Sequence, residues 1–212
     1  MQLSFQPPPE NCPLCPRLCQ FREDNRRKFH NFFNAPVPSF GSLDAELLVV
    51  GLAPGLKGAN RTGRPFTGDY AGLVLYASLK TFGFAEGDYK ESADDGLRLV
   101  NCRITNAVRC VPQENKPEPS EIKNCNAFLV NEIKAMPRLK VILSLGLVSH
   151  NAVLKAMGLK AAFAKFEHGK QHRLTDALTL IDSYHCSRYN INTGRLNQAM
   201  FDAVVGKVAA LL

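Results

Sequence analysis

Four short apolar runs, each followed by a helical pattern, constrain the fold more than any other feature of this chain. Rich in Val, Ile and Leu, the runs are expected to be buried strands. They span residues 46–52, 98–108, 139–145 and 177–183. The helical patterns span residues 70–82, 120–136, 148–157 and 195–211. This alternation predicts an α/β fold in three layers, with a four-stranded, mostly parallel sheet covered by helices on both faces.

The first 40 residues show neither a strand period nor a helix period. They contain PPP, two Cys-Pro pairs and the charge run REDNRRK. We expect an irregular N-terminal arm attached to one domain that spans residues 1–212.

The charge balance favours a polyanionic partner. Lys and Arg total 26 against 19 acidic residues, which gives a formal net charge of +7. Such an excess is typical of proteins that bind nucleic acid, although many basic proteins do not. The N-terminus lacks a secretory pattern, and no stretch approaches the ~20 apolar residues of a membrane span. We therefore expect a cytoplasmic protein without a membrane segment, and a monomer by default.

Seven cysteines in a chain without an export signal indicate metal or cluster ligation rather than a disulfide framework. Cys12 and Cys15 form CPLC, which precedes the first strand, whereas a redox CxxC opens a helix after a strand. Cys110 and Cys125 flank a Pro-rich turn, so that a fold can bring them to the arm. Four thiolates suit zinc or an iron–sulfur cluster, and their spacing does not distinguish the two. The others are interpreted as small buried hydrophobes: Cys19, Cys102 and Cys186.

The segment GLAPGLKGANRTGRPFTGD, residues 51–69, follows the first strand. It lacks the Lys-Ser/Thr of a phosphate-binding Walker loop, and it is too long for a dinucleotide-binding turn. Long ordered loops at the carboxyl end of a strand are usually functional. Phe66 offers a stacking face and Asp69 a carboxylate, although singly they fit a core residue and a helix N-cap. The loop's basic residues can meet backbone phosphates: Lys57, Arg61 and Arg64.

A second polar group follows the other strands. His185 lies just past the last strand in DSYHCSRYNINTGRL, and Asn106 ends the second strand. A lone histidine at a strand end is usually structural. In a parallel sheet, however, both residues share an edge with the 51–69 loop, which predicts a ligand site there. Nearby polar and basic residues extend it: Arg188, Tyr189 and Asn190.

Together these segments resemble family 5, the type B iron–sulfur branch of the uracil-DNA glycosylase superfamily. The resemblance rests on the 51–69 loop, on ITNAVRC with NKPEP and Cys125, and on SYHCSRYNINTGRL, in family order. Two positions depart from it: Cys186 stands where Pro is usual, and Pro112-Gln113 replaces a Pro pair.

The resemblance implies roles for individual residues. A 4Fe-4S cluster would be bound by Cys12, Cys15, Cys110 and Cys125. Phe66 would stack on an extruded base, Asn106 would bind its Watson–Crick edge, and His185 would donate to its carbonyl oxygen. Asp69 would direct water, and its reference pKa of roughly 4 leaves it ionised at neutral pH without tuning. The remaining base- or DNA-contacting positions are Gly51, Ala53, Arg188, Tyr189 and Asn190.

The implied activity is that of a monofunctional glycosylase. It would flip uracil from double- or single-stranded DNA and hydrolyse the N-glycosidic bond to leave an abasic site. Family members also accept other deaminated bases or exocyclic adducts. Two alternatives remain open at this stage: a non-enzymatic nucleic-acid-binding protein stapled by zinc or a cluster, and a thiol oxidoreductase at CPLC.

Overall fold

The computed structural model describes residues 5–212. Its main sheet has six strands in the order β1-β5-β2-β6-β8-β7, and a separate two-stranded sheet pairs β3 with β4. The strands are β1 (Phe40–Gly41), β2 (Leu47–Gly51), β3 (Ala85–Glu86), β4 (Arg98–Leu99), β5 (Cys102–Asn106), β6 (Val141–Leu145), β7 (Gln171–Arg173) and β8 (Thr179–Ser183). The α-helices are α1 (Pro16–Lys28), α2 (Ala59–Thr62), α3 (Tyr70–Thr81), α4 (Pro119–Lys134), α5 (Leu147–Ala156), α6 (Arg188–Asn192) and α7 (Gln198–Ala209). Two 3-10 turns are η1 (Gln113–Asn115) and η2 (Ala161–Phe163).

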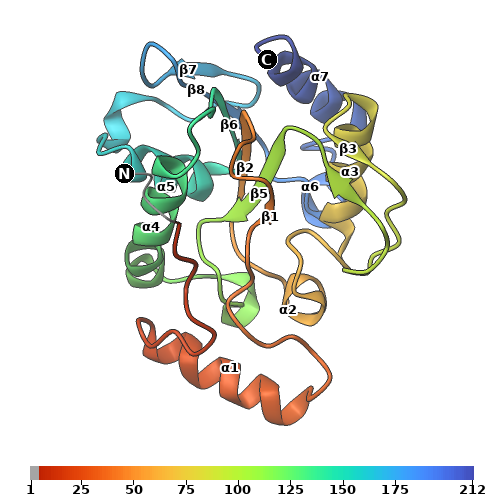
Figure 1. Cartoon of the computed structure of the whole chain (residues 1–212), viewed down its shortest axis with the longest axis vertical. Helices are drawn as coiled ribbons and strands as arrows, with labels where there is room; N and C mark the ends of the chain where they lie inside the picture. Colours follow the sequence, from red (N-terminus) through yellow and green to blue (C-terminus); the bar gives the residue numbers. More distant parts are fainter. Residues whose placement is uncertain (1–4) are drawn as a thin grey trace.

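Alternate residues of the central strands enter two different cores, because successive side chains point to opposite faces of a sheet. On β2, Leu47 and Val49 pack in the core that α3 and α7 cover. Leu48 and Val50 pack in the core that α4 and α5 cover. The result is the expected three-layer α/β arrangement, with one pair of helices on each side of the sheet (Figure 1).

The expected sheet of four strands was incomplete. The four predicted strands form its parallel centre, but β1 and β7 add antiparallel edges of two and three residues. These edges have no apolar alternation to reveal them, since they are short and polar or half-buried. The predicted strand 98–108 also divides in two at Asn101, whose φ of 49° lies in the left-handed region. Its first part, β4, pairs with β3 instead.

The expectation of an irregular arm was wrong for residues 16–28, which form helix α1. Pro16 occupies the first turn, where its missing N–H costs nothing. The buried positions of α1 are Leu18, Arg22 and Asn25. Only one of these is apolar, so the helix has no apolar stripe for a sequence pattern to detect. In Figure 1, α1 lies apart from the sheet, below the body of the fold.

Candidate active site

Three segments meet beyond the carboxyl ends of the parallel strands. Phe66 and Asp69 come from the loop after β2, Asn106 ends β5, and His185 follows β8. All four line one pocket with about 250 Å³ of empty space. A wider cleft shares Asp69 and His185 with this pocket and opens beyond it. The sequence therefore predicted correctly which distant residues come together.

Phe66 is the aromatic wall of the pocket. Its ring is 6.0 Å, centroid to centroid, from that of His185, with 27° between the planes. Its φ of 52° is in the left-handed region, which is unusual for a bulky residue. A Cβ atom on Gly51 would lie 2.5 Å from the Phe66 ring and 2.3 Å from Asn106 Oδ1. Gly51 thus lies behind these two side chains and lets them approach, rather than lining the pocket as expected.

Asp69 combines the two roles that the sequence left open. It is the N-cap of α3, where its Oδ1 accepts a hydrogen bond from the Gly72 N–H at 3.2 Å, and it also lines the pocket. A Cβ on Gly58 would lie 2.5 Å from Asp69 Oδ2, so this glycine makes room for the carboxylate. Burial raises the pKa of Asp69 above its ordinary value. The expectation that its pKa would be unperturbed was wrong, because the sequence does not show burial.

His185 is a neutral imidazole at pH 7, because burial lowers its pKa to about 4. Its backbone is held by Asn190, whose Nδ2 donates to the His185 carbonyl at 2.8 Å. Asn190 therefore positions the histidine from behind. Cys186 is fully buried, and its Sγ donates to the Ala71 carbonyl at 3.5 Å, which ties the histidine segment to α3.

Asn106 carries an unsatisfied polar atom into the pocket. Its side chain is 3% exposed, and among residues 5–212 no group hydrogen-bonds its Oδ1. A buried acceptor without a partner costs about 1–3 kcal/mol, so such atoms are rare in folded proteins. This atom can accept a hydrogen bond from a ligand.

The four cysteines singled out in the sequence line a second cavity between α1 and the start of α4. Cys19, expected to be a buried hydrophobe, is half-buried and lines the same cavity. Burial raises the pKa of Cys110 to about 12 and that of Cys125 to about 11. As free thiols they would stay protonated, whereas a bound cationic centre stabilises thiolates. Arg22, 5% exposed, also borders the cavity and adds a positive charge.

A third group has the residue types of a metal site but is fully engaged in hydrogen bonds. His150, His172 and Asp182 place ligand atoms within 4.8 Å of one another. Asp182 contacts His150 Nδ1 at 2.7 Å and His172 Nε2 at 2.9 Å, and it accepts from Ser144 Oγ at 2.7 Å. Burial alone would raise the pKa of Asp182, but the hydrogen bonds from these partners lower it below its usual value. We interpret the group as a buried network that anchors β8.

Comparison with known proteins assigns the family. A family model described as the uracil-DNA glycosylase superfamily matches residues 38–209. A type-5 uracil-DNA glycosylase of Thermus thermophilus is 42% identical over 195 residues, which covers 90% of this chain and 89% of the relative. Another, from Pyrobaculum aerophilum, is 38% identical and covers 94% and 88%. This chain is a type-5 member of the uracil-DNA glycosylase superfamily. A type-4 uracil-DNA glycosylase of the same archaeon is 30% identical over 72% of this chain and 64% of the relative.

Of the other residues expected at this glycosylase-family site, some line the pocket or the cleft and one does not. Ala53 lines both the pocket and the cleft, as expected. Arg188 lines the cleft, with its guanidinium 5.3 Å from the centre of the Tyr70 ring. Tyr189 is 74% exposed and lies outside the lining of both.

Asn115 is a lining residue of the cleft that sequence reasoning missed. Asn115 begins the NKPEP motif that supports the family resemblance, but no role was assigned to it. Asn115 and its neighbour Glu114 both have positive φ, 57° and 53°. Asn tolerates this conformation, so the Gln-Glu-Asn-Lys between two prolines was the available signal for a special turn.

Arg64 was expected to meet DNA phosphates, and this was wrong. Its side chain is 5% exposed and pairs with Asp95, whose side chain is fully buried.

Among residues 5–212, no helix combines the length and hydrophobicity needed to cross a membrane.

Proposed function

We propose that this protein removes uracil from DNA by flipping the base into the pocket of Phe66, Asp69, Asn106 and His185 and hydrolysing its N-glycosidic bond. The observation that carries the proposal is the convergence of these four side chains from three strand ends in one pocket. The names of the type-5 relatives support uracil in DNA as the substrate. As parts of the same proposal, the protein acts as a monomer in the cytoplasm on double- or single-stranded DNA.

Recognition of the base would use Phe66 and Asn106. Stacking on an aromatic side chain contributes about 1–3 kcal/mol per base. The unpartnered Asn106 Oδ1 can accept the ring N–H of uracil. Flipping costs a few kcal/mol and costs least for a mispaired base such as uracil opposite guanine. At the mouth of the cleft, Arg188 lies where it can contact the DNA backbone or the gap, with Tyr189 exposed beside it.

The chemical step breaks the bond between the base nitrogen and the sugar carbon. Its electron pair leaves with uracil, and positive charge develops on the sugar. A neutral His185 can donate a hydrogen bond to the uracil carbonyl oxygen that gains charge, as oxyanion-hole donors do. Asp69 orients water toward the sugar carbon and accepts its proton as the new C–O bond forms. Ala53, which lines this pocket, brings no polar group, so the water depends on Asp69.

The cysteine cavity fits a 4Fe-4S cluster bound by Cys12, Cys15, Cys110 and Cys125. Four thiolates suit both zinc and a 4Fe-4S cluster. The resemblance to the iron–sulfur branch of the superfamily is what favours the cluster. When bound, the cluster would supply covalent cross-links that join the arm to the rest of the fold.

The test is single-turnover uracil release from a duplex with one uracil. Asp69→Asn and His185→Ala should each slow release, the latter by about 10²–10³-fold, the loss typical of one oxyanion donor. DNA binding should survive in both. Wild-type rates in both variants would remove these residues from the mechanism. Parallel duplexes with hypoxanthine, xanthine and a bulky cytosine adduct measure how selective the pocket is.

The alternative function is a nucleic-acid-binding protein without catalysis, which the positive charge and the cysteine cavity also favour. It predicts tight DNA binding with no abasic sites formed in that assay. Colour separates the two metal centres, since a 4Fe-4S protein is brown and a zinc protein is colourless.

A further inference from the structure

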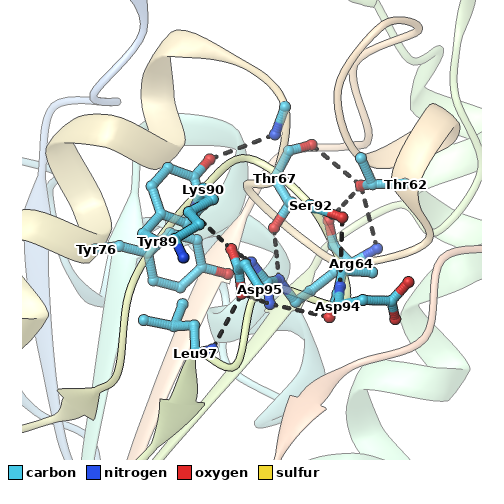
Figure 2. Close-up of polar contacts among 12 residues, drawn as sticks. Thr62, Arg64, Thr67, Tyr76, Tyr89, Lys90, Ser92, Asp94, Asp95 and Leu97 are labelled. Atoms are coloured by element: carbon cyan, nitrogen blue, oxygen red, sulfur yellow. Dashed lines mark hydrogen bonds and ion pairs between the residues drawn. The ribbon is translucent and has the colours of Figure 1, made fainter.

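The wall of the base pocket is fixed from outside by residues 83–101, the segment that connects α3 to β5 and carries the β3–β4 sheet. The first contact is between Arg64 and Asp95. Two parallel hydrogen bonds, 2.8 and 2.7 Å long, join the guanidinium to both carboxylate oxygens. Figure 2 shows this pair among its polar neighbours. Both side chains are buried, so solvent screens the pair much less than it screens an exposed ion pair.

Asp95 also shapes its own segment. Its Oδ2 accepts from the Lys90 N–H at 2.9 Å, and its Oδ1 accepts from the Leu97 N–H at 3.0 Å. A carboxylate that accepts these bonds is stabilised as the anion, which lowers the pKa of Asp95 despite burial. One side chain therefore holds residues 90–97 together and attaches them to Arg64.

On the other side, Arg64 is joined to the residues around Phe66. Its Nε donates to Thr67 Oγ1 at 2.8 Å. Its guanidinium also lies 5.2 Å from the centre of the Phe40 ring and 5.9 Å from that of Tyr89. A planar guanidinium can form the paired hydrogen bonds and these ring contacts together, which an ammonium group cannot do.

The second contact is the hydroxyl of Tyr89. It donates to the Phe66 carbonyl at 3.0 Å and accepts from the Gly68 N–H at 3.3 Å. The hydroxyl therefore joins the carbonyl of the left-handed Phe66 to the Gly68 N–H, across Thr67. A Cβ on Gly72 would lie 1.9 Å from the Phe66 oxygen, so the first turn of α3 packs against the same point. A residue in this strained conformation persists only where its surroundings hold it.

We propose that Tyr89 and Asp95 are positioning residues of the glycosylase: they hold Phe66 in its left-handed conformation so that its ring faces His185 across the base pocket. Neither side chain lines the pocket. They act through the backbone of the 62–69 loop. Their only effect on a base in the pocket is therefore through the position of the Phe66 ring. This inference rests on the proposed function, because it assigns Phe66 to the reacting base.

The decisive variant is Tyr89→Phe, which removes one hydroxyl and keeps the ring. Small displacements of positioning groups cost up to ~10²-fold in rate, so we expect single-turnover uracil release to slow about tenfold. Affinity for a duplex with an abasic site should change by less than about twofold, because no DNA-contacting group is removed. A rate within twofold of wild type overturns the inference.

Two further measurements separate positioning from general destabilisation. If Tyr89 acts through Phe66, the Tyr89→Phe/Phe66→Ala double variant should be no slower than Phe66→Ala alone. A slower double variant overturns the inference. Arg98→Gln is the matched control, because it breaks an exposed ion pair with Glu86 in the same segment, and it should keep the wild-type rate.

Phe66→Ala and the unmodified protein together distinguish failure of this inference from failure of the proposed function. Absence of uracil release by the unmodified protein would overturn the proposed function. A wild-type rate in Phe66→Ala would remove Phe66 from base recognition and overturn the positioning role, while the glycosylase function would stand. A slow Phe66→Ala beside a wild-type Tyr89→Phe would overturn the positioning role alone. Asp95→Asn should slow the same step and also lower the unfolding midpoint, since it leaves Arg64 buried with a weakened partner. A wild-type rate in Asp95→Asn would exclude Asp95 from the role.

Discussion

The base pocket and the cysteine cavity are built in different ways. The pocket residues extend from β2, β5 and β8, strands that belong to one continuous hydrogen-bonded sheet. The cavity lies outside the sheet, where α1 meets α4. There the apolar contact is small, with Leu18, Val108 and Cys125 as its buried members.

Side chains make most of the cavity's connections. Arg17 forms an ion pair with Glu121 at 2.7 Å, and Asn124 Nδ2 donates to the Leu14 carbonyl at 2.8 Å. Such exposed or half-buried pairs each contribute little. We therefore expect the fold to stay stable when a functional side chain of the pocket is lost. The stability of the region around the cavity should instead depend on the metal centre that its cysteines bind.

The largest effect should come from Cys110→Ala. Loss of one of four proposed cluster ligands should give a colourless protein that is unstable or insoluble, because the arm loses its cross-link. Visible absorbance, iron content and thermal unfolding measure this. Cys19→Ala is the matched control in the same cavity and should stay coloured. A stable, active Cys110→Ala protein would mean that the cavity does not depend on a metal centre for its stability.

Glu132→Gln tests the junction between the regions. Glu132 is fully buried and contacts Arg109, Arg103 and Thr105. Although burial favours its protonated form, the two arginines lower its pKa. The Arg109 N–H in turn donates to Cys125 Sγ at 3.3 Å. Removing the charge should cost about 3–5 kcal/mol, as measured by chemical unfolding. An exposed equivalent, Glu86→Gln, should cost under about 1 kcal/mol.

The pH dependence sharpens the description of the pocket. Asp69 must be ionised to accept a proton, so the single-turnover rate should fall about tenfold per pH unit below its pKa. Because burial raises that pKa, the acid limb should lie at a higher pH than an exposed aspartate would give. His185, with a pKa of about 4, is a neutral imidazole at pH 7. The limb should persist in His185→Ala and disappear in Asp69→Asn; persistence in both would assign it to another group.

The smallest effect should be on the stability of Asp69→Asn. Folding raises the pKa of Asp69, so the contribution of this group to stability is largest below its unfolded-state pKa and is lost as the pH rises through its folded-state pKa towards pH 7. A neutral asparagine avoids this loss and remains a good N-cap. We expect the unfolding midpoint to stay or to rise by less than ~4 °C while activity is lost. A clear fall would show that the pocket depends on this carboxylate for its fold.

The layered fold and the members of the pocket could be predicted from the sequence alone. Hydrophobic periodicity identified the central strands, and parallel strands place their carboxyl ends at one edge, so Phe66, Asp69, Asn106 and His185 could be brought together from order along the chain. Hydrophobic periodicity and the order of residues along the chain can both be taken from a single sequence. The grouping of Cys12 and Cys15 with Cys110 and Cys125 was predictable for a different reason, since few alternatives fit unpaired cysteines.

The tertiary structure decided the features that depend on contacts between distant, individually unremarkable residues. Helix α1 has a single buried apolar side chain, and β1 and β7 are short sheet edges, so neither produces a period. Arg64 changed from an expected phosphate contact to a buried partner of Asp95, 31 residues away. The raised pKa of Asp69 reflects burial by the surrounding loop. Burial and long-range pairing are properties of the packed chain, and no local pattern encodes them.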